Sequence, residues 1–161
     1  MKHYTYVGPE EIRARVSPTG TPIGSVDDLR AWVVAHDADR EHGTVPATFT
    51  VQPDGMLRIA PRRSEHVACA GGESVLSAGE LFLVANAVEG ASNQSTGYCP
   101  EPICWVALAA ALDRAGIPHP GKFTIEVTFR RCTSCGERNL VKDDWYTCAI
   151  CDAELPRDWN F

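Results

Sequence analysis

The spacing of four cysteines is the feature of this sequence that points most directly to chemistry. Cys132, Cys135, Cys148 and Cys151 form two C-x-x-C pairs, separated by twelve residues, in the segment CTSCGERNLVKDDWYTCAIC. Two thiolates at this spacing can bind one ion from a tight turn, and Gly136 follows the first pair, where such a turn often ends. In a cytosolic chain, spaced cysteine pairs are more typical of metal ligands than of disulfides. We therefore predict that all four cysteines bind a single ion.

Zinc is the metal that a closed set of four thiolates suits best, and iron in a rubredoxin-like site is the alternative. Residues 139–141 and 145–147 have the composition of short strands joined by the polar turn KDD, and that hairpin would return the second pair to the first. The segment at about residues 130–161 resembles a zinc ribbon. Four protein ligands leave no open coordination position, so we expect one zinc ion with a structural role.

A second candidate site is the loop at residues 92–101, which begins with Ser92, ends with Glu101 and leads into an apolar helix. A helix start offers unpaired amides and partial positive charge, which suit a phosphate or a carboxylate. We predict that this loop binds an anionic, phosphate-bearing small molecule such as a nucleotide, with charge from Arg62 or Arg63. The structural alternative is that these polar side chains only form turns and caps. The hydrogen-bonding residues concerned are Asn93, Gln94, Ser95, Thr96 and Tyr98.

The same loop leaves a cysteine-dependent enzyme open as an alternative. Cys99 stands just ahead of the predicted helix, where a lowered thiol pKa is expected. His66 could act as its base, with Asn93 or Glu65 orienting the ring, and Glu101 could act as an acid or base. The sequence does not show that Cys99 and His66 meet. We therefore assign no enzyme activity from the sequence.

A zinc deaminase is a weaker alternative. Such enzymes carry H-x-E followed by P-C-x-x-C. This chain has Glu65 beside His66, and Cys99 is followed by Cys104 five positions later. Both departures affect metal ligands or the proton shuttle, so the pattern does not favour this chemistry.

Composition and charge restrict the partners that we expect. The formal net charge is −6 and the sequence pI is near 5.3, which argues against nucleic-acid binding, because phosphate contacts require a cationic surface. No apolar run reaches the roughly 18–20 residues of a membrane-spanning helix, and the start MKHYTYVGPEE lacks the apolar core of a secretory signal. We therefore expect a cytoplasmic protein. Arginine supplies 12 of the 15 basic residues and alanine is abundant, which is typical of GC-rich bacteria.

The elements that must position these residues indicate an α+β fold. Helices are predicted at residues 9–16, 26–37 and 102–116, a β-hairpin at 47–60, and strands at 80–88 and 123–129. The helix at 102–116 is apolar on almost every face, so we expect it to be buried centrally against a small mixed sheet. The strand at 123–129 continues without a linker into the first cysteine pair. We predict a domain at residues 1–129 with the ribbon at 130–161 packed rigidly on it.

An interaction module is the alternative from a different functional class. In an adaptor or immunity-type protein, the ribbon and the C-terminal residues DWNF would contact a protein partner. The same aromatic tail could instead pack back on the body of the protein.

Overall fold

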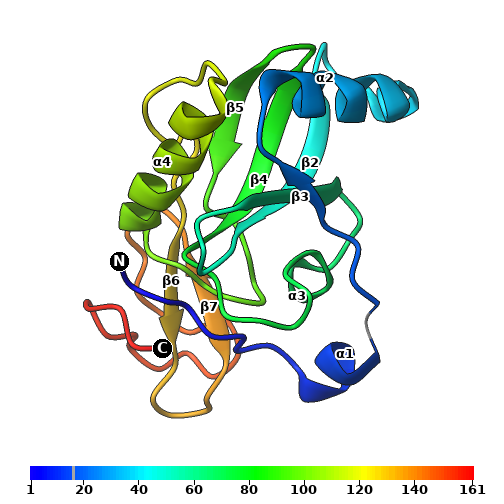
Figure 1. Ribbon diagram of the computed structural model, residues 1–161. Helices are drawn as coiled ribbons and strands as arrows, with labels where there is room; N and C mark the ends of the chain where they lie inside the picture. The colour runs from blue at the N-terminus through cyan, green and yellow to red at the C-terminus, as the bar shows by residue number, and fades with distance from the viewer. Residues whose placement is uncertain (16) are drawn as a thin grey trace.

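The computed structural model describes residues 1–15 and 17–161, and the last residue of the helix predicted at 9–16 lies outside these ranges. Its α-helices are α1 (Glu10–Arg15), α2 (Val26–Ala35), α3 (His66–Cys69) and α4 (Trp105–Ala115), with single 3-10 turns at Asp37–Asp39 and Pro102–Cys104. The strands are β1 (Thr21–Ile23), β2 (Val45–Val51), β3 (Leu57–Pro61), β4 (Ser77–Val84), β5 (Ala87–Ser92), β6 (Thr128–Arg131) and β7 (Arg138–Val141). Figure 1 shows their arrangement.

The larger sheet has five strands in the order β1-β3-β2-β4-β5. The predicted hairpin is confirmed: β2 and β3 pair antiparallel, with Phe49 opposite Ile59, and Gly55 at a φ of 87° allows the tight turn. The α+β class is confirmed, but all four ladders of this sheet are antiparallel, so the mixed sheet was wrong. A parallel pairing occurs only as the isolated bridge between Ser92 and Ile125 in the described part of the chain.

Helix α2 follows its sequence pattern closely. Ser25 caps the helix, because its side chain accepts a hydrogen bond of 3.1 Å from the backbone N–H of Asp28. Leu29, Trp32 and Val33 are all buried, as the apolar stripe predicted. The helix therefore packs this stripe on the core and leaves its other face to solvent.

Helix α4 lies as a layer on the sheet, against β2, β3 and β4, and is not enclosed on every side (Figure 1). Leu108 and Leu112 are fully buried, whereas Val106 is 50% exposed. The predicted buried central helix is therefore not confirmed. The helix contains five alanines, which give an apolar sequence with little side-chain area to remove from water. It ends where expected, at Gly116 with a φ of 70°.

The segment at residues 123–129 forms a strand only from Thr128 onward, so the predicted seven-residue strand was wrong. Thr124 and Ile125 donate backbone hydrogen bonds to the carbonyl of Ala91, and Ile125 is 53% exposed. The predicted strand at 139–141 exists, but β7 pairs with β6 rather than with residues 145–147. Strand β6 therefore extends across residue 129, where we placed the domain boundary.

No helix in the described residues has the length and apolar character needed to span a membrane.

Candidate metal centre

Two similar turns carry the four cysteines. The first leaves β6 at Cys132, and the backbone N–H of Gly136, at a φ of 81°, returns to the carbonyl of Cys132 at 2.9 Å. In the second, Asp152 adopts a φ of 63° and its N–H returns to the carbonyl of Cys148 at 3.0 Å. Each C-x-x-C pair is thus closed by a left-handed residue directly after it. This geometry turns both cysteines of a pair toward the same point.

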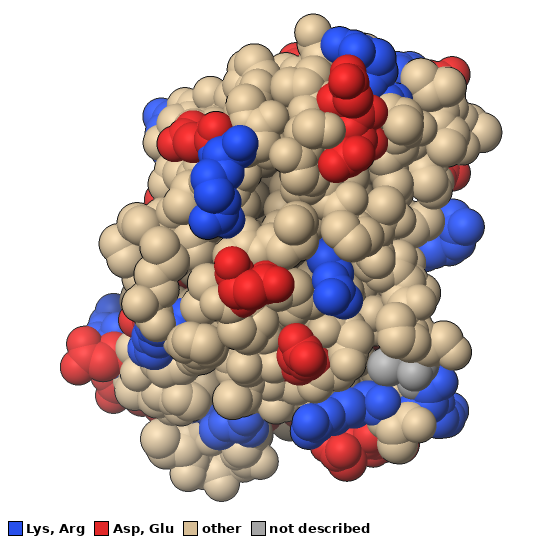
Figure 2. All heavy atoms as spheres, in the orientation of Figure 1, with Lys and Arg blue, Asp and Glu red and all other residues tan. Residues whose placement is uncertain are grey.

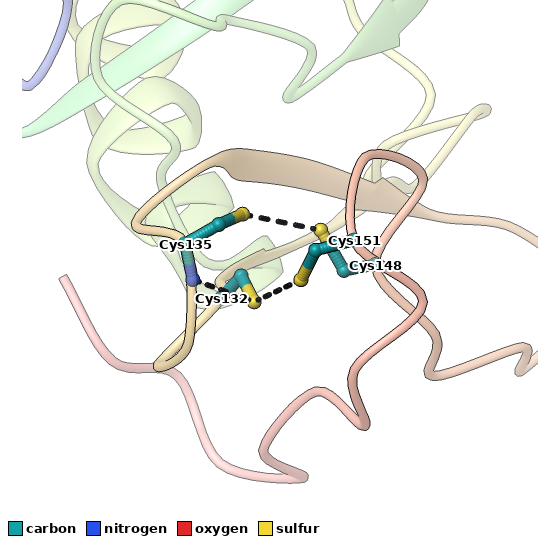
Figure 3. A group of neighbouring side chains, drawn as sticks. All are labelled: Cys132, Cys135, Cys148 and Cys151. Carbon is teal, nitrogen blue, oxygen red and sulfur yellow. Dashed lines mark hydrogen bonds between the residues drawn. The ribbon is translucent and has the colours of Figure 1, made fainter.

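The four sulfurs converge on one small volume (Figure 3). All of them lie within 4.8 Å of one another, with 3.5 Å between the Sγ atoms of Cys132 and Cys151 and 3.6 Å between those of Cys135 and Cys148. A disulfide requires about 2.05 Å. A tetrahedral ion with metal–sulfur bonds of about 2.3 Å requires sulfurs about 3.8 Å apart. The spacing fits ligands around one ion and does not fit disulfides.

Backbone and side-chain N–H groups surround these sulfurs. Cys132 Sγ accepts from the backbone N–H of Cys135 at 3.5 Å, and Cys148 Sγ accepts from the N–H of Ile150 at 3.4 Å. Hydrogen bonding, led by the backbone N–H of Cys151, lowers the pKa of the Cys148 thiol to about 6. A thiolate is the form that binds a metal, so these donors favour the ligand state.

Asn139 is a contributor that the sequence analysis missed. Its side chain is 5% exposed; Nδ2 donates to Cys148 Sγ at 3.4 Å and Oδ1 accepts from the N–H of Ala149 at 3.0 Å. It thereby connects β7 to the second cysteine turn. The only signal in the sequence was its place between the two C-x-x-C pairs. That signal is weak, because an asparagine at this place could equally face solvent.

The hydrophobic cluster around the sulfurs is small. Its buried members are Val141 and Leu155 together with Cys132 and Cys148. So few apolar side chains remove little surface from water, and small domains of this kind commonly depend on a metal or a disulfide for stability. The cysteine set can supply that stabilisation by holding one metal ion.

The loop at residues 92–101 is the surface on which the C-terminal segment sits. The indole Nε1 of Trp159 donates to the carbonyl of Cys99 at 2.8 Å, and Arg138 donates to the carbonyl of Thr96. Asn93 is fully buried; it donates to the carbonyls of Val127 (2.9 Å) and Pro100 (3.1 Å) and accepts from the N–H of Val127 (2.8 Å). The polar groups of this loop therefore serve contacts within the chain.

Other residues of the loop form turns. Ser95 Oγ accepts from the N–H of Tyr98 at 3.3 Å, and the Tyr98 hydroxyl donates to the carbonyl of Glu73 at 2.6 Å. Gln94 is exposed, and its N–H donates to Ser92 Oγ. These contacts agree with the structural alternative, and binding of an anion at the loop stays a prediction.

Cys99 does not have the environment expected of a nucleophile. It is fully buried, and burial raises the pKa of its thiol to about 12. The expectation of a lowered pKa was wrong, because the 3-10 turn at Pro102–Cys104 separates Cys99 from α4, which begins at Trp105. A role of Cys99 in catalysis stays a prediction without a contact that favours it.

His66 and Glu101 also have partners within the chain. His66 Nε2 lies 2.8 Å from the carbonyl of Gly79, and burial lowers the pKa of this histidine to about 4. Glu101 pairs with the Lys2 ammonium at 2.8 Å and accepts from the Tyr4 hydroxyl at 3.2 Å. Glu65 is exposed and precedes α3.

Arg62 and Arg63 lie on another part of the surface. Arg62 pairs with Glu80 at 2.9 Å and with Glu41 at 3.2 Å, so its charge is already balanced. With Arg63, Arg62 borders a hollow of about 270 Å³ whose lining includes Asp39 and Glu41. On the face drawn in Figure 2, basic and acidic side chains are interspersed rather than gathered by sign.

Comparison with protein families, with curated proteins and with solved structures finds no match for this chain.

Proposed function

We propose that this protein binds one zinc ion through Cys132, Cys135, Cys148 and Cys151, and that the ion has a structural role. The convergence of four sulfurs within 4.8 Å carries the proposal. A set of four thiolates suits zinc, which prefers tetrahedral sulfur ligands and brings no redox chemistry. Because all four positions are filled by protein ligands, a substrate finds no place on the ion. The site would therefore fold residues 130–161 as a ribbon.

Metal analysis of the purified protein tests this proposal. We expect one zinc per chain, lost in Cys132→Ser and Cys148→Ser and retained in Cys104→Ala, which removes a buried cysteine outside the cluster. Iron instead of zinc would give visible absorption. A native chain without a transition metal, or one whose four thiols react freely without loss of structure, contradicts the proposal.

A second candidate function is recognition of a protein partner by exposed residues of the segment at 130–161. Trp145 is 71% exposed and Ile150 is 69% exposed, although both stand close in sequence to metal-ligating cysteines. Tryptophan is among the residue types that contribute most binding energy at protein–protein interfaces. Asp143 and Asp144 adjoin Trp145 and are exposed, so the complementary partner is a protein surface with basic and apolar groups.

Site-specific photo-crosslinking tests this second function in cells that produce the protein. A photoreactive amino acid at position 145 should capture one partner, and the product should be lost when Asp143 and Asp144 are both changed to Ser. The same photoreactive group in place of Lys122, an exposed residue of the body, serves as the matched control. If position 145 gives no product, or only products that position 122 also gives, the partner function is wrong.

A further inference from the structure

Two arginines stand directly opposite each other on the β6–β7 hairpin. Arg131 and Arg138 are partners in its antiparallel register, so both side chains lie on the same face of the hairpin. The Cβ atoms of directly opposite residues are about 4.5–5.5 Å apart, and like charges at this distance destabilise the pairing. An anion between the two guanidinium groups would relieve this repulsion.

The described residues supply no carboxylate to this pair. Arginines elsewhere in the chain have one close by: Arg30 and Arg40 lie 3.0 Å and 2.8 Å from carboxylate oxygens. Neither Arg131 nor Arg138 forms an ion pair with any residue that the structure describes. Glu137 adjoins Arg138 in the sequence, but it is exposed and belongs to none of these pairs. The two positive charges are therefore uncompensated.

The proposed zinc centre does not balance these charges directly. A zinc ion with four thiolates is a dianion, and the hairpin face beside it carries Asn139, which donates to Cys148 Sγ. Arg130 is the direct partner of Asn139 and shares that face. Successive side chains of a strand alternate, so Arg131 and Arg138 lie on the opposite face.

Backbone contacts fix both guanidinium groups and leave most of their donors free. Nη1 of Arg138 donates to the carbonyl of Thr96, and Nη1 of Arg131 donates to the carbonyl of Gly136 at 2.9 Å. The ring of Phe161 lies 5.1 Å from the Arg131 guanidinium carbon and supports one side of it. An arginine has five N–H donors in a planar fork, which matches the oxygens of a phosphate or a carboxylate.

The loop at residues 92–101 borders this pair. The bond from Arg138 joins the hairpin to the loop at Thr96, and the side chains of Thr96 and Gln94 are exposed there. Burial raises the pKa of the Cys99 thiol to about 12, and the charges of Arg138 and Arg131 act in the opposite direction. Both charges are therefore close enough to act on a residue of the loop.

We propose that Arg131 and Arg138 bind a phosphate dianion where the hairpin meets this loop, with Thr96 and Gln94 donating to its remaining oxygens. A phosphate monoester carries about −1.5 to −2 charges at neutral pH, so it balances two arginines better than a singly charged carboxylate does. Inorganic phosphate and a small-molecule phosphate monoester share this chemistry. The proposal rests on the proposed function, because the zinc would fold the hairpin that carries both arginines.

Calorimetric titration of the full chain tests this proposal with inorganic phosphate, adenosine monophosphate, adenosine and dimethyl phosphate. We expect the first two to bind and to shift the amide resonances of residues 94–97 and 138, and adenosine not to bind. Tighter binding of adenosine monophosphate than of inorganic phosphate would identify the monoester as the ligand class. Arg131→Gln and Arg138→Gln should each weaken binding at least about tenfold.

Arg157→Gln is the matched control and should bind as the wild type does. Arg157 is an exposed arginine of the same segment, but its guanidinium lies over the ring of Tyr146, 4.2 Å from the centroid. The substitution removes the same charge from the segment, so an equal loss of affinity in this variant would show general attraction of anions and would overturn the proposed site.

Three further results would overturn the proposal. Binding of neither phosphate compound would mean that the two arginines only hold the loop. Equal binding of dimethyl phosphate, which carries a single charge, would remove the dianion. Unchanged affinity in the folded variants, or wild-type shifts only outside the residues named, would place the ligand elsewhere. Zinc is measured in every sample: loss of binding with zinc retained bears on this site, whereas a chain without metal contradicts the zinc proposal.

Discussion

Asn93 connects the loop at residues 92–101 to the part of the chain that leads into β6. Its amide satisfies three backbone groups of Val127 and Pro100, all by hydrogen bonds of 3.1 Å or less. Asn93→Ala leaves these groups without partners, and each unsatisfied buried group costs about 1–3 kcal/mol. We expect the free energy of unfolding to fall by roughly 3 kcal/mol in urea denaturation. Gln94→Ala, at an exposed neighbour, should change it by less than about 0.5 kcal/mol.

His66 should make stability depend on pH. Burial lowers its pKa from 6.5 to about 4 in the folded protein, so between these values the unfolded chain binds the proton more readily. The contribution of neutral His66 is therefore complete above pH 6.5 and is lost as the pH falls toward 4. At about 1.4 kcal/mol per pH unit, the loss approaches roughly 3 kcal/mol.

Denaturation of wild type and His66→Gln across this pH range measures the effect. The metal site also weakens in acid, so the difference between the two proteins isolates the histidine. Parallel stability curves would show that His66 titrates normally in the folded state.

At the scale of elements, the β6–β7 hairpin connects the two cysteine turns through one side chain. Asn139 on β7 donates to Cys148 Sγ and fixes the backbone at Ala149. Residues that orient metal ligands in this way typically change metal affinity by about 10- to 100-fold when they are replaced. We expect Asn139→Ala to lose zinc affinity within this range in competition with a chromogenic chelator. Lys142→Ala, at an exposed residue just after β7, should keep the wild-type affinity, and equal affinities in both variants would contradict the role of Asn139.

The elements also show which sequence patterns predict structure. The Ser25 cap and the β2–β3 hairpin formed as expected, because each depends on residues a few positions apart. The alternation of apolar and polar residues at 123–129 predicted a strand. Thr124, Ile125 and Val127 instead form hydrogen bonds with Ala91 and Asn93, and an alternating pattern does not indicate such distant partners. The apolar character of α4 predicted a buried helix, but alanine gives the same apolar pattern whether it is covered or open to water.

At the scale of the whole molecule, Trp159 ties the C-terminus to the N-terminus and to the loop at residues 92–101. Its indole binds the Cys99 carbonyl, its ring packs edge-on against Tyr4 at 5.7 Å, and the Lys2 ammonium lies 3.6 Å from its centroid. Trp159→Ala removes all three contacts, and we expect a loss of about 2–3 kcal/mol in thermal unfolding. Amide hydrogen exchange at residues 96–101 should become faster.

Trp145→Ala is the matched control, because the same residue type is 71% exposed there and its loss should cost less than about 0.5 kcal/mol. Equal destabilisation by the two substitutions would show that Trp159 does not hold the two parts together.

The sequence by itself determined the cysteine cluster, the capped helix α2 and the central hairpin. Each of these depends on residue types at short, fixed spacings, so it forms from local contacts and needs little information from distant parts of the chain. Only the tertiary structure decided the role of the polar loop, since the partners of Asn93 and Cys99 stand 34 and 60 residues away. A hydrogen-bonding side chain is compatible with many partners, and which one it meets depends on the packing of segments that are distant in the sequence.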